Sequence, residues 1–163
     1  MDYKTMQFDE RTKIIADKLD KLIDSKKLNF YANDSEVDAI FNMPAEDLFR
    51  LPHQKLSEYS YLLSRYGVYL QKELNKERGL LNWARRSLDY IVLPKLKEYR
   101  HGYMSNDEVK MCAIRDNELA TKFWGFIVDK ENEVGIISDL NFDIRKMSDH
   151  LGDIAKSKRF ANA

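Results

Sequence analysis

The chain is poor in the residues that break helices or cross-link chains: its 163 residues include six glycines, three prolines and one cysteine. A single thiol, Cys112, cannot form an internal disulfide, which fits a reducing compartment. Few prolines and glycines, together with 33% charged residues, are typical of helical proteins with solvated faces. We therefore expect an all-α protein in which Cys112 is a small core residue.

Long apolar runs are also missing. No segment approaches the roughly 20 apolar residues that cross a bilayer, and the N-terminal stretch MDYKTMQFDERTK has no apolar core of a signal peptide. This predicts a soluble, cytoplasmic protein without a membrane partner.

The chain contains no HExxH, CxxC, phosphate-binding glycine loop or nucleophile elbow. Its three histidines, His53, His101 and His150, are scattered along the sequence. We expect no enzyme activity, no catalytic residue, no metal site and no cofactor.

One acidic run allows an alternative. Asp129, Glu131 and Glu133 could hold Mg²⁺ together with Asp116 and Glu118, as a small nuclease would require. On a helix, however, the first three carboxylates fan around the axis, so a solvated face is the simpler interpretation.

The net charge is zero, but the charges are unevenly distributed. Residues 1–60 carry a net −3, residues 61–102 a net +5, and residues 103–163 a net −2. A local site for an anion is therefore compatible with a neutral chain.

The apolar spacing predicts helices throughout the first half, at 8–24, from Asp34 or Ser35 to 41, after Pro44, and from 53–57 up to Pro94. The last of these has nearly 40 residues, and Pro52 ends the short helix before it.

In the second half, Gly102 suits a turn, and Ser105 with Glu108 forms a capping box. It opens a second long helix, for which Asn141 is the expected C-cap, and a short helix follows at 142–154. The predicted fold is a long antiparallel helical hairpin with short N- and C-terminal helices, oligomerising through helix packing. We expect an N-terminal extension at 1–45, a hairpin core at 46–155 and a flexible basic tail at 156–163.

The first long helix has more apolar surface than one partner can cover. Besides a stripe at steps of three and four, Tyr61, Leu62, Val68 and Tyr69 lie on another side. The N-terminal helices could cover this second stripe, but a second copy of the chain is the more economical partner. The candidates for an oligomer interface are Tyr59, Leu62, Leu63, Tyr66, Tyr69, Leu70, Phe123, Trp124 and Ile127.

Cations and aromatic residues alternate in the net positive segment. The candidate DNA-binding cations are Lys72, Lys76, Arg78, Arg85, Arg86, Lys95, Lys97 and Arg100, and the candidate stacking residues are Trp83, Tyr90 and Tyr99. Single-stranded nucleic acid is held by this combination, because cations neutralise phosphates and bases stack on aromatic rings. Ordinary surface ion pairs and a core Trp83 would explain the same residues.

The stretch RDNELATKFWGFIVD resembles a segment of the UvsY family of recombination mediators from T4-type bacteriophages. NFDIRKMSD is similar to the family's later Gly-Phe-x-Ile-Lys-x-Ile-x-Asp ending, with Asn141 in place of the glycine. The matching positions are Phe123, Trp124, Gly125, Ile127, Val128, Asp129, Phe142, Ile144, Arg145, Met147 and Asp149. Upstream, LPHQKLSEYSYLLSRY and RRSLDY are also like the family, so the resemblance covers about residues 50–150.

The resemblance implies a ring-forming helical protein that binds single-stranded DNA. Such a mediator helps load a RecA-like recombinase onto DNA covered by single-strand-binding protein, in the cytoplasm of the host cell. The family's DNA-contacting pair is a basic-x-basic triplet before Leu-Asp-Tyr. Arg85 matches its first position, Ser87 stands at its second, and Arg86 lies between them.

We therefore expect a recombination mediator that acts in DNA recombination and repair. The alternative is a phage structural or adaptor protein whose basic segment contacts an acidic protein.

Overall fold

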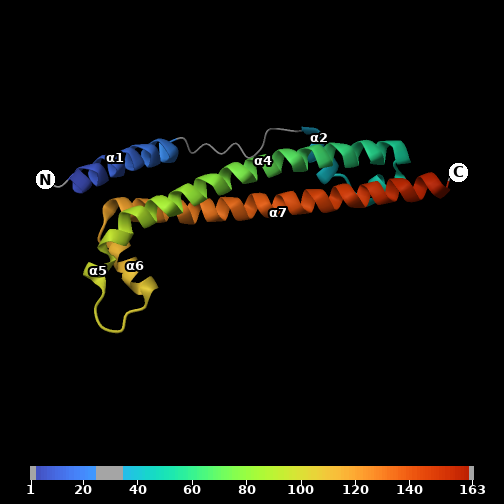
Figure 1. Cartoon of the computed structure of the whole chain (residues 1–163). Helices are drawn as coiled ribbons and strands as arrows, with labels where there is room; N and C mark the ends of the chain where they lie inside the picture. Colours follow the sequence, from blue (N-terminus) through green and yellow to red (C-terminus); the bar gives the residue numbers. More distant parts are fainter. Residues whose placement is uncertain (1–2, 25–34, 162–163) are drawn as a thin grey trace. The chain divides into compact units, whose positions relative to one another are not determined.

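The computed structural model describes residues 3–24 and 35–161. It contains helices and one 3₁₀ turn (Figure 1): α1 (Tyr3–Asp24), α2 (Ser35–Phe41), α3 (Ala45–Arg50), α4 (His53–Val92), η1 (Leu93–Lys95), α5 (Leu96–Tyr99), α6 (Asn106–Arg115) and α7 (Glu118–Ala161). No strand occurs in these two ranges, and the predicted all-α class is confirmed. None of the helices described combines the length and the apolar character that a bilayer crossing requires.

Prolines bound the 40-residue helix α4, as the sequence predicts. Pro52 directly precedes its first residue, His53, and Pro94 lies in the 3₁₀ turn after its last residue, Val92. A proline ring clashes with the carbonyl four residues earlier and has no N–H for the helix ladder. The chain therefore cannot continue α4 past this point without a break.

The prediction for the second half was wrong in two places. The helix that begins after Ser105 ends at Arg115, and Asn117 starts α7 by accepting a hydrogen bond at Oδ1 from the N–H of Ala120, at 3.0 Å. Asn141 does not end a helix, because α7 is continuous from Glu118 to Ala161. Its Nδ2 instead donates to Gln71 Oε1 of α4 at 2.9 Å, so the side chain bridges two helices.

The chain forms two compact units, each assembled from separate stretches of sequence. Unit 1 contains Met1–Leu28 and Glu77–Glu133, and unit 2 contains Asn29–Lys76 and Val134–Ala163. Both α4 and α7 therefore contribute one part to each unit. The domain boundaries predicted at 45/46 and 155/156 stay predictions.

Unit 2 has an aliphatic core between its parts of α4 and α7, with α2 packed against it. The core residues are Val37, Ile40, Leu56, Leu63, Leu70, Leu74, Ile137, Ile144, Leu151 and Ala155. Each is at most 4% exposed. On α4, Leu56, Leu63 and Leu70 recur every seven residues, which keeps them on one face.

Small polar residues join the same two helices. Ser60 Oγ donates to the carbonyl of Ser148 at 2.9 Å, and Ser148 Oγ donates to the carbonyl of Ser60 at 2.8 Å. A Cβ on Gly152 would lie 3.3 Å from Ser60 Oγ, closer than ordinary van der Waals contact. Glycine at this position thus lets the backbones approach.

The segment predicted as a flexible tail is helical up to Ala161. Within unit 2, Lys158 Nζ donates to the carbonyl of Leu51 at 2.7 Å and also to that of Phe49. These two carbonyls lie at the end of α3, where no further helical turn follows to donate N–H groups to them. The lysine therefore ties the last turns of α7 to the end of α3.

Unit 1 is centred on aromatic and aliphatic side chains of α4 and α7. Phe123 is 0% exposed, and its ring lies 5.6 Å from the ring of Trp83, between centroids. Leu19 of α1 is also completely buried. Helix α1 is therefore part of this unit's core.

Candidate nucleic-acid interface

Three candidate binding residues lie on one side of α4 in unit 1. Trp83, Arg86 and Tyr90 are separated by three and four residues, which is the spacing of neighbours on a helix surface. Arg86 is exposed, whereas Trp83 and Tyr90 are half-buried. The arrangement gives one cation between two aromatic rings.

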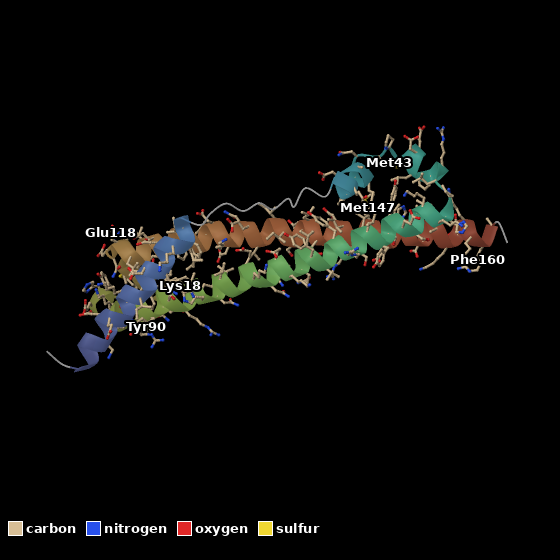
Figure 2. The ribbon with its side chains drawn as sticks, turned by 90° about the horizontal axis from the view of Figure 1, so that it is seen from above. Lys18, Met43, Tyr90, Glu118, Met147 and Phe160 are labelled. Atoms are coloured by element: carbon tan, nitrogen blue, oxygen red, sulfur yellow. The ribbon has the colours of Figure 1, made fainter. Side chains whose placement is uncertain are left out.

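Helix α1 covers both of these rings. Lys18 Nζ lies 4.3 Å from the ring centroid of Trp83, and Arg11 Cζ lies 4.8 Å from that of Tyr90. Figure 2 labels Lys18 of α1 and Tyr90 of α4. Phe8 also stacks on Tyr90, with 5.1 Å between ring centroids. The two cations are seven residues apart on α1, as the two rings are on α4, so the contacts repeat at the same helical spacing.

The adjacent arginines differ in their electrostatic surroundings. Arg85 Nη2 lies 2.6 Å from Glu131 Oε1 of α7, so part of its charge is already neutralised. Arg86 forms no ion pair with any residue in the described ranges. Ser87, at the second basic position of the resembled triplet, is only 5% exposed. A charged side chain at position 87 would have to be buried, and Arg86 is the exposed cation beside it.

The remaining candidate cations divide between the units. Lys72 and Lys76 are exposed in unit 2, and Lys76 pairs with Glu73. Arg78, Lys95 and Lys97 are exposed in unit 1 and have no ion-pair partner among the described residues.

Two of the candidates lie where α5 packs against α6 (Figure 1). Arg100 is exposed and donates through Nη2 to Asn106 Oδ1, and Tyr99 is half-buried. Gly102 has a φ of +63°, a conformation that glycine adopts without a steric penalty. The predicted capping box of Ser105 and Glu108 is confirmed at the start of α6.

Tyr103, next to Gly102, belongs to the aromatic residues that are interleaved with the cations in the sequence, but it is not among the three candidate stacking residues. It is the most exposed large apolar side chain described, with a relative accessibility of 109%. The sequence places it beside Arg100 and His101, but gives no sign of whether its ring is packed or free.

The acidic run is engaged with cations. Glu131 pairs with Arg85, and Glu133 accepts from Lys130, which also lies 2.7 Å from Glu77. Over residues 3–24 and 35–161, no group of three or more His, Cys, Asp or Glu side chains lies close enough to hold a metal ion. Glu131 and Glu133 thus have electrostatic partners that do not involve a metal.

The buried group around Lys130 is not anticipated by the sequence analysis. The Lys130 side chain is 6% exposed, that of Glu77 11% and that of Glu133 16%. Burial disfavours the ammonium, but hydrogen bonds to Glu133 and Glu77 outweigh this effect and raise the pKa of Lys130 above its ordinary value of 10.5. The lysine is therefore held as a cation inside unit 1.

The nine candidates for an oligomer interface differ in exposure. Leu63, Leu70, Phe123 and Ile127 are buried within the single chain. Tyr59, Leu62 and Tyr66 are half-buried against the core of unit 2. Tyr69 and Trp124 are exposed by 38% and 39%, so these two have surface left for another molecule.

The chain matches no protein-family model, no curated protein and no solved structure.

Proposed function

We propose that this protein is a non-enzymatic mediator of recombination that binds single-stranded DNA and helps load a RecA-like recombinase onto DNA covered by single-strand-binding protein. The resemblance of residues 50–150 to the UvsY family supplies the biological role. The position of Arg86 supports the DNA-binding part: it is exposed, has no ion pair in the described part of the chain, and lies between Trp83 and Tyr90 on α4.

Neighbouring charges favour the same ligand. Arg78, Lys95 and Lys97 are exposed without ion-pair partners among the described residues of unit 1. A phosphate chain would gain from each cation by releasing condensed counterions, whereas cations already paired with carboxylates contribute less. Arg86 is therefore the principal phosphate contact in the proposal, and Arg85 a secondary one.

The proposal includes an antiparallel hairpin of α4 and α7. In unit 2, Ser60 pairs with Ser148 and Gln71 with Asn141, so a later position on α4 meets an earlier one on α7. In unit 1, Glu77 pairs with Lys130 and Trp83 contacts Phe123, in the same order. Each unit thus has the pairing that an antiparallel hairpin requires.

Self-association is the other structural part of the proposal. Tyr69 in unit 2 and Trp124 in unit 1 are candidates that keep exposed apolar surface. Val68 and Val128, which adjoin them on the same helices at steps of one and four residues, are also exposed, by 55% and 39%. A ring of subunits would repeat the Arg86 site, and several weak contacts to one strand would act together.

The test is fluorescence anisotropy with a labelled oligo-dT at several salt concentrations, with light scattering on the same sample. We expect salt-sensitive binding by an oligomer, weakened at least ten-fold, or roughly 1.4 kcal/mol, by Arg85→Glu with Arg86→Glu. Lack of binding at low salt by a folded protein would refute the DNA-binding function.

The adaptor alternative is favoured by one observation. The aromatic and basic side of α4 already binds a protein segment, since α1 covers Trp83 and Tyr90. An adaptor would bind an acidic protein through this surface, and the double charge reversal would abolish that complex. A nuclease, in contrast, would show metal-dependent cleavage that is lost in Asp129→Asn.

A further inference from the structure

The covered rings of α4 raise the question of where a DNA base could stack. A cation of α1 lies over Trp83, and a cation and a phenyl ring of α1 lie against Tyr90. To reach either ring, a base would have to displace these groups. The displacement would also expose Leu19 of α1, which is completely buried in unit 1. Stacking on either ring therefore costs the contacts of a whole helix.

Stacking on Tyr103 requires no displacement of a helix. Its ring is fully exposed in the turn between α5 and α6, with a relative accessibility of 109%. Among the described residues, no ring contacts it and no cation lies over it. Both of its faces are therefore open to a ligand.

The turn around Tyr103 is fixed on both sides. Before it, Arg100 donates to Asn106, and Gly102 adopts a φ of +63°. After it, Ser105 Oγ accepts from the N–H of Glu108 at 3.3 Å, while the Glu108 carboxylate accepts from the N–H of Ser105 at 2.8 Å. These bonds hold the ends of the turn, so less conformational entropy is lost when a ligand binds it.

The charges beside the ring suit a polyanion. Lys95, Lys97 and Arg100 precede Tyr103 within eight residues, against one acid, Glu98. Stacking on a tyrosine ring favours a nucleobase of any sequence, and the nearby cations favour the phosphates that join successive bases. An exposed ring with cations on its N-terminal side thus fits a strand whose bases are unpaired. On its C-terminal side, Asp107 and Glu108 lie in the first turn of α6, where Glu108 is held in the capping box.

We propose that the turn between α5 and α6 is a stacking site for an unpaired nucleobase, with Tyr103 as the platform and Arg100 as the adjoining phosphate contact. This site rests on the proposed function, because it is part of the same single-stranded-DNA surface. It replaces Trp83 and Tyr90 as the place where a base stacks while α1 is docked.

The test uses the full chain and an oligo-dT that contains one 2-aminopurine. We expect Tyr103→Ala to weaken binding about ten-fold and to abolish the fluorescence change caused by stacking. Tyr103→Phe keeps the ring and should bind within about two-fold of the parent. Phe160→Ala is the matched control, since Phe160 is an aromatic residue exposed by 79% near the end of α7 in unit 2, and it should leave binding unchanged.

The outcomes separate the two proposals. If the parent binds and Tyr103→Ala binds equally well, the stacking site is wrong while the DNA-binding function stands. The same follows if Tyr90→Leu removes the fluorescence change and Tyr103→Ala does not, because the base then stacks beneath α1. If the parent chain does not bind at all, the proposed function itself fails. Equal circular dichroism spectra would show that the variants are folded.

Discussion

Lys130 Nζ of α7 lies 2.7 Å from Glu77 Oε2 of α4, and both side chains are almost completely buried. Glu133 completes the group, so two carboxylates surround one ammonium. Removing the cation would leave the two carboxylates without a counter-charge in a region of low dielectric. Much of the cost of such a change comes from the carboxylates that stay behind.

We expect Lys130→Met to lower the free energy of unfolding by about 3–5 kcal/mol. Urea denaturation followed by circular dichroism measures this loss. Lys122→Met is the matched control on the same helix, because its ion pair with Glu118 is 3.8 Å long and exposed, and its loss should cost less than about 1 kcal/mol. Similar losses in both variants would contradict the role assigned to the buried group.

The raised pKa of Lys130 predicts how the free energy of unfolding changes at alkaline pH. Its pKa in the folded protein is raised above 10.5, so the stability that it adds is complete below that value and is lost as the pH rises through the folded-state pKa. Unfolding free energies measured from about pH 9 to about pH 12 should fall more steeply for the parent than for Lys130→Met. Parallel curves would show that Lys130 does not contribute to the alkaline loss.

The capping box predicts a response to acid. The backbone N–H and the hydroxyl of Ser105 donate to the Glu108 carboxylate and lower its pKa below the ordinary 4.5. The stability from this carboxylate is therefore present above pH 4.5 and is lost as the pH falls through the lowered pKa. Acid titrations of Glu108→Gln, which keeps a hydrogen-bonding side chain without the charge, should lack this component.

Ser105→Ala removes the cap of α6 by a different route. Because its hydroxyl accepts from the N–H of Glu108, we expect a loss of about 1 kcal/mol at neutral pH. Thermal or urea unfolding measures it, and Ser57→Ala on the exposed first turn of α4 serves as control. Ser57 Oγ donates to the carbonyl of His53 and caps no N–H, so its loss should cost less.

Two glycines should respond to alanine in opposite directions. Gly102 has a positive φ, so Gly102→Ala should destabilise the chain by about 1 kcal/mol. Gly79 lies inside α4, where a Cβ would have no described atom within 4 Å, and Gly79→Ala should stabilise the chain by about 0.5–1 kcal/mol. Urea denaturation of both variants tests the assignment, which fails if the signs are the same.

Arg85 and Arg86 should contribute unequally to DNA binding. Arg86→Ala is expected to weaken oligo-dT binding and to lower the salt slope by about 0.7, the value for one phosphate contact on a single strand. Arg85→Ala should do less, since Glu131 already neutralises part of that charge. Arg50→Ala, in unit 2, is the control. A larger effect at Arg85 would reverse the assigned roles.

Local patterns predicted the helices well where a break has its own chemical mark. Pro52 and Pro94 fix the ends of α4, and the Ser105–Glu108 pair fixes the start of α6. The break at Asn117 has no such mark, because the apolar stripe continues past it and asparagine also occurs inside helices. Asn141 shows the same ambiguity, since only its partner Gln71, 70 residues away, explains its place within α7.

The sequence indicated which residues make up the candidate site, but not which of them stay accessible to a ligand. The spacing of Trp83 and Tyr90 indicates a shared side of α4, yet α1 reaches them through residues more than 60 positions earlier in the chain. The partner of Arg85 is likewise 46 residues away. Packing between segments far apart in the sequence decides which cations and rings stay accessible to a ligand. The spacing of residues within one helix does not report that packing.

The reciprocal bonds of Ser60 and Ser148 in unit 2 fix the alignment of two helices. A pair of helices joined only by leucines every seventh residue can shift by one turn and still bury similar surface. Here such a shift would break both hydroxyl bonds and move the space beside Gly152 away from Ser60. Unit 2 therefore has a single preferred alignment of α4 and α7. It is selected by the hydroxyls of Ser60 and Ser148 and by the lack of a side chain at Gly152.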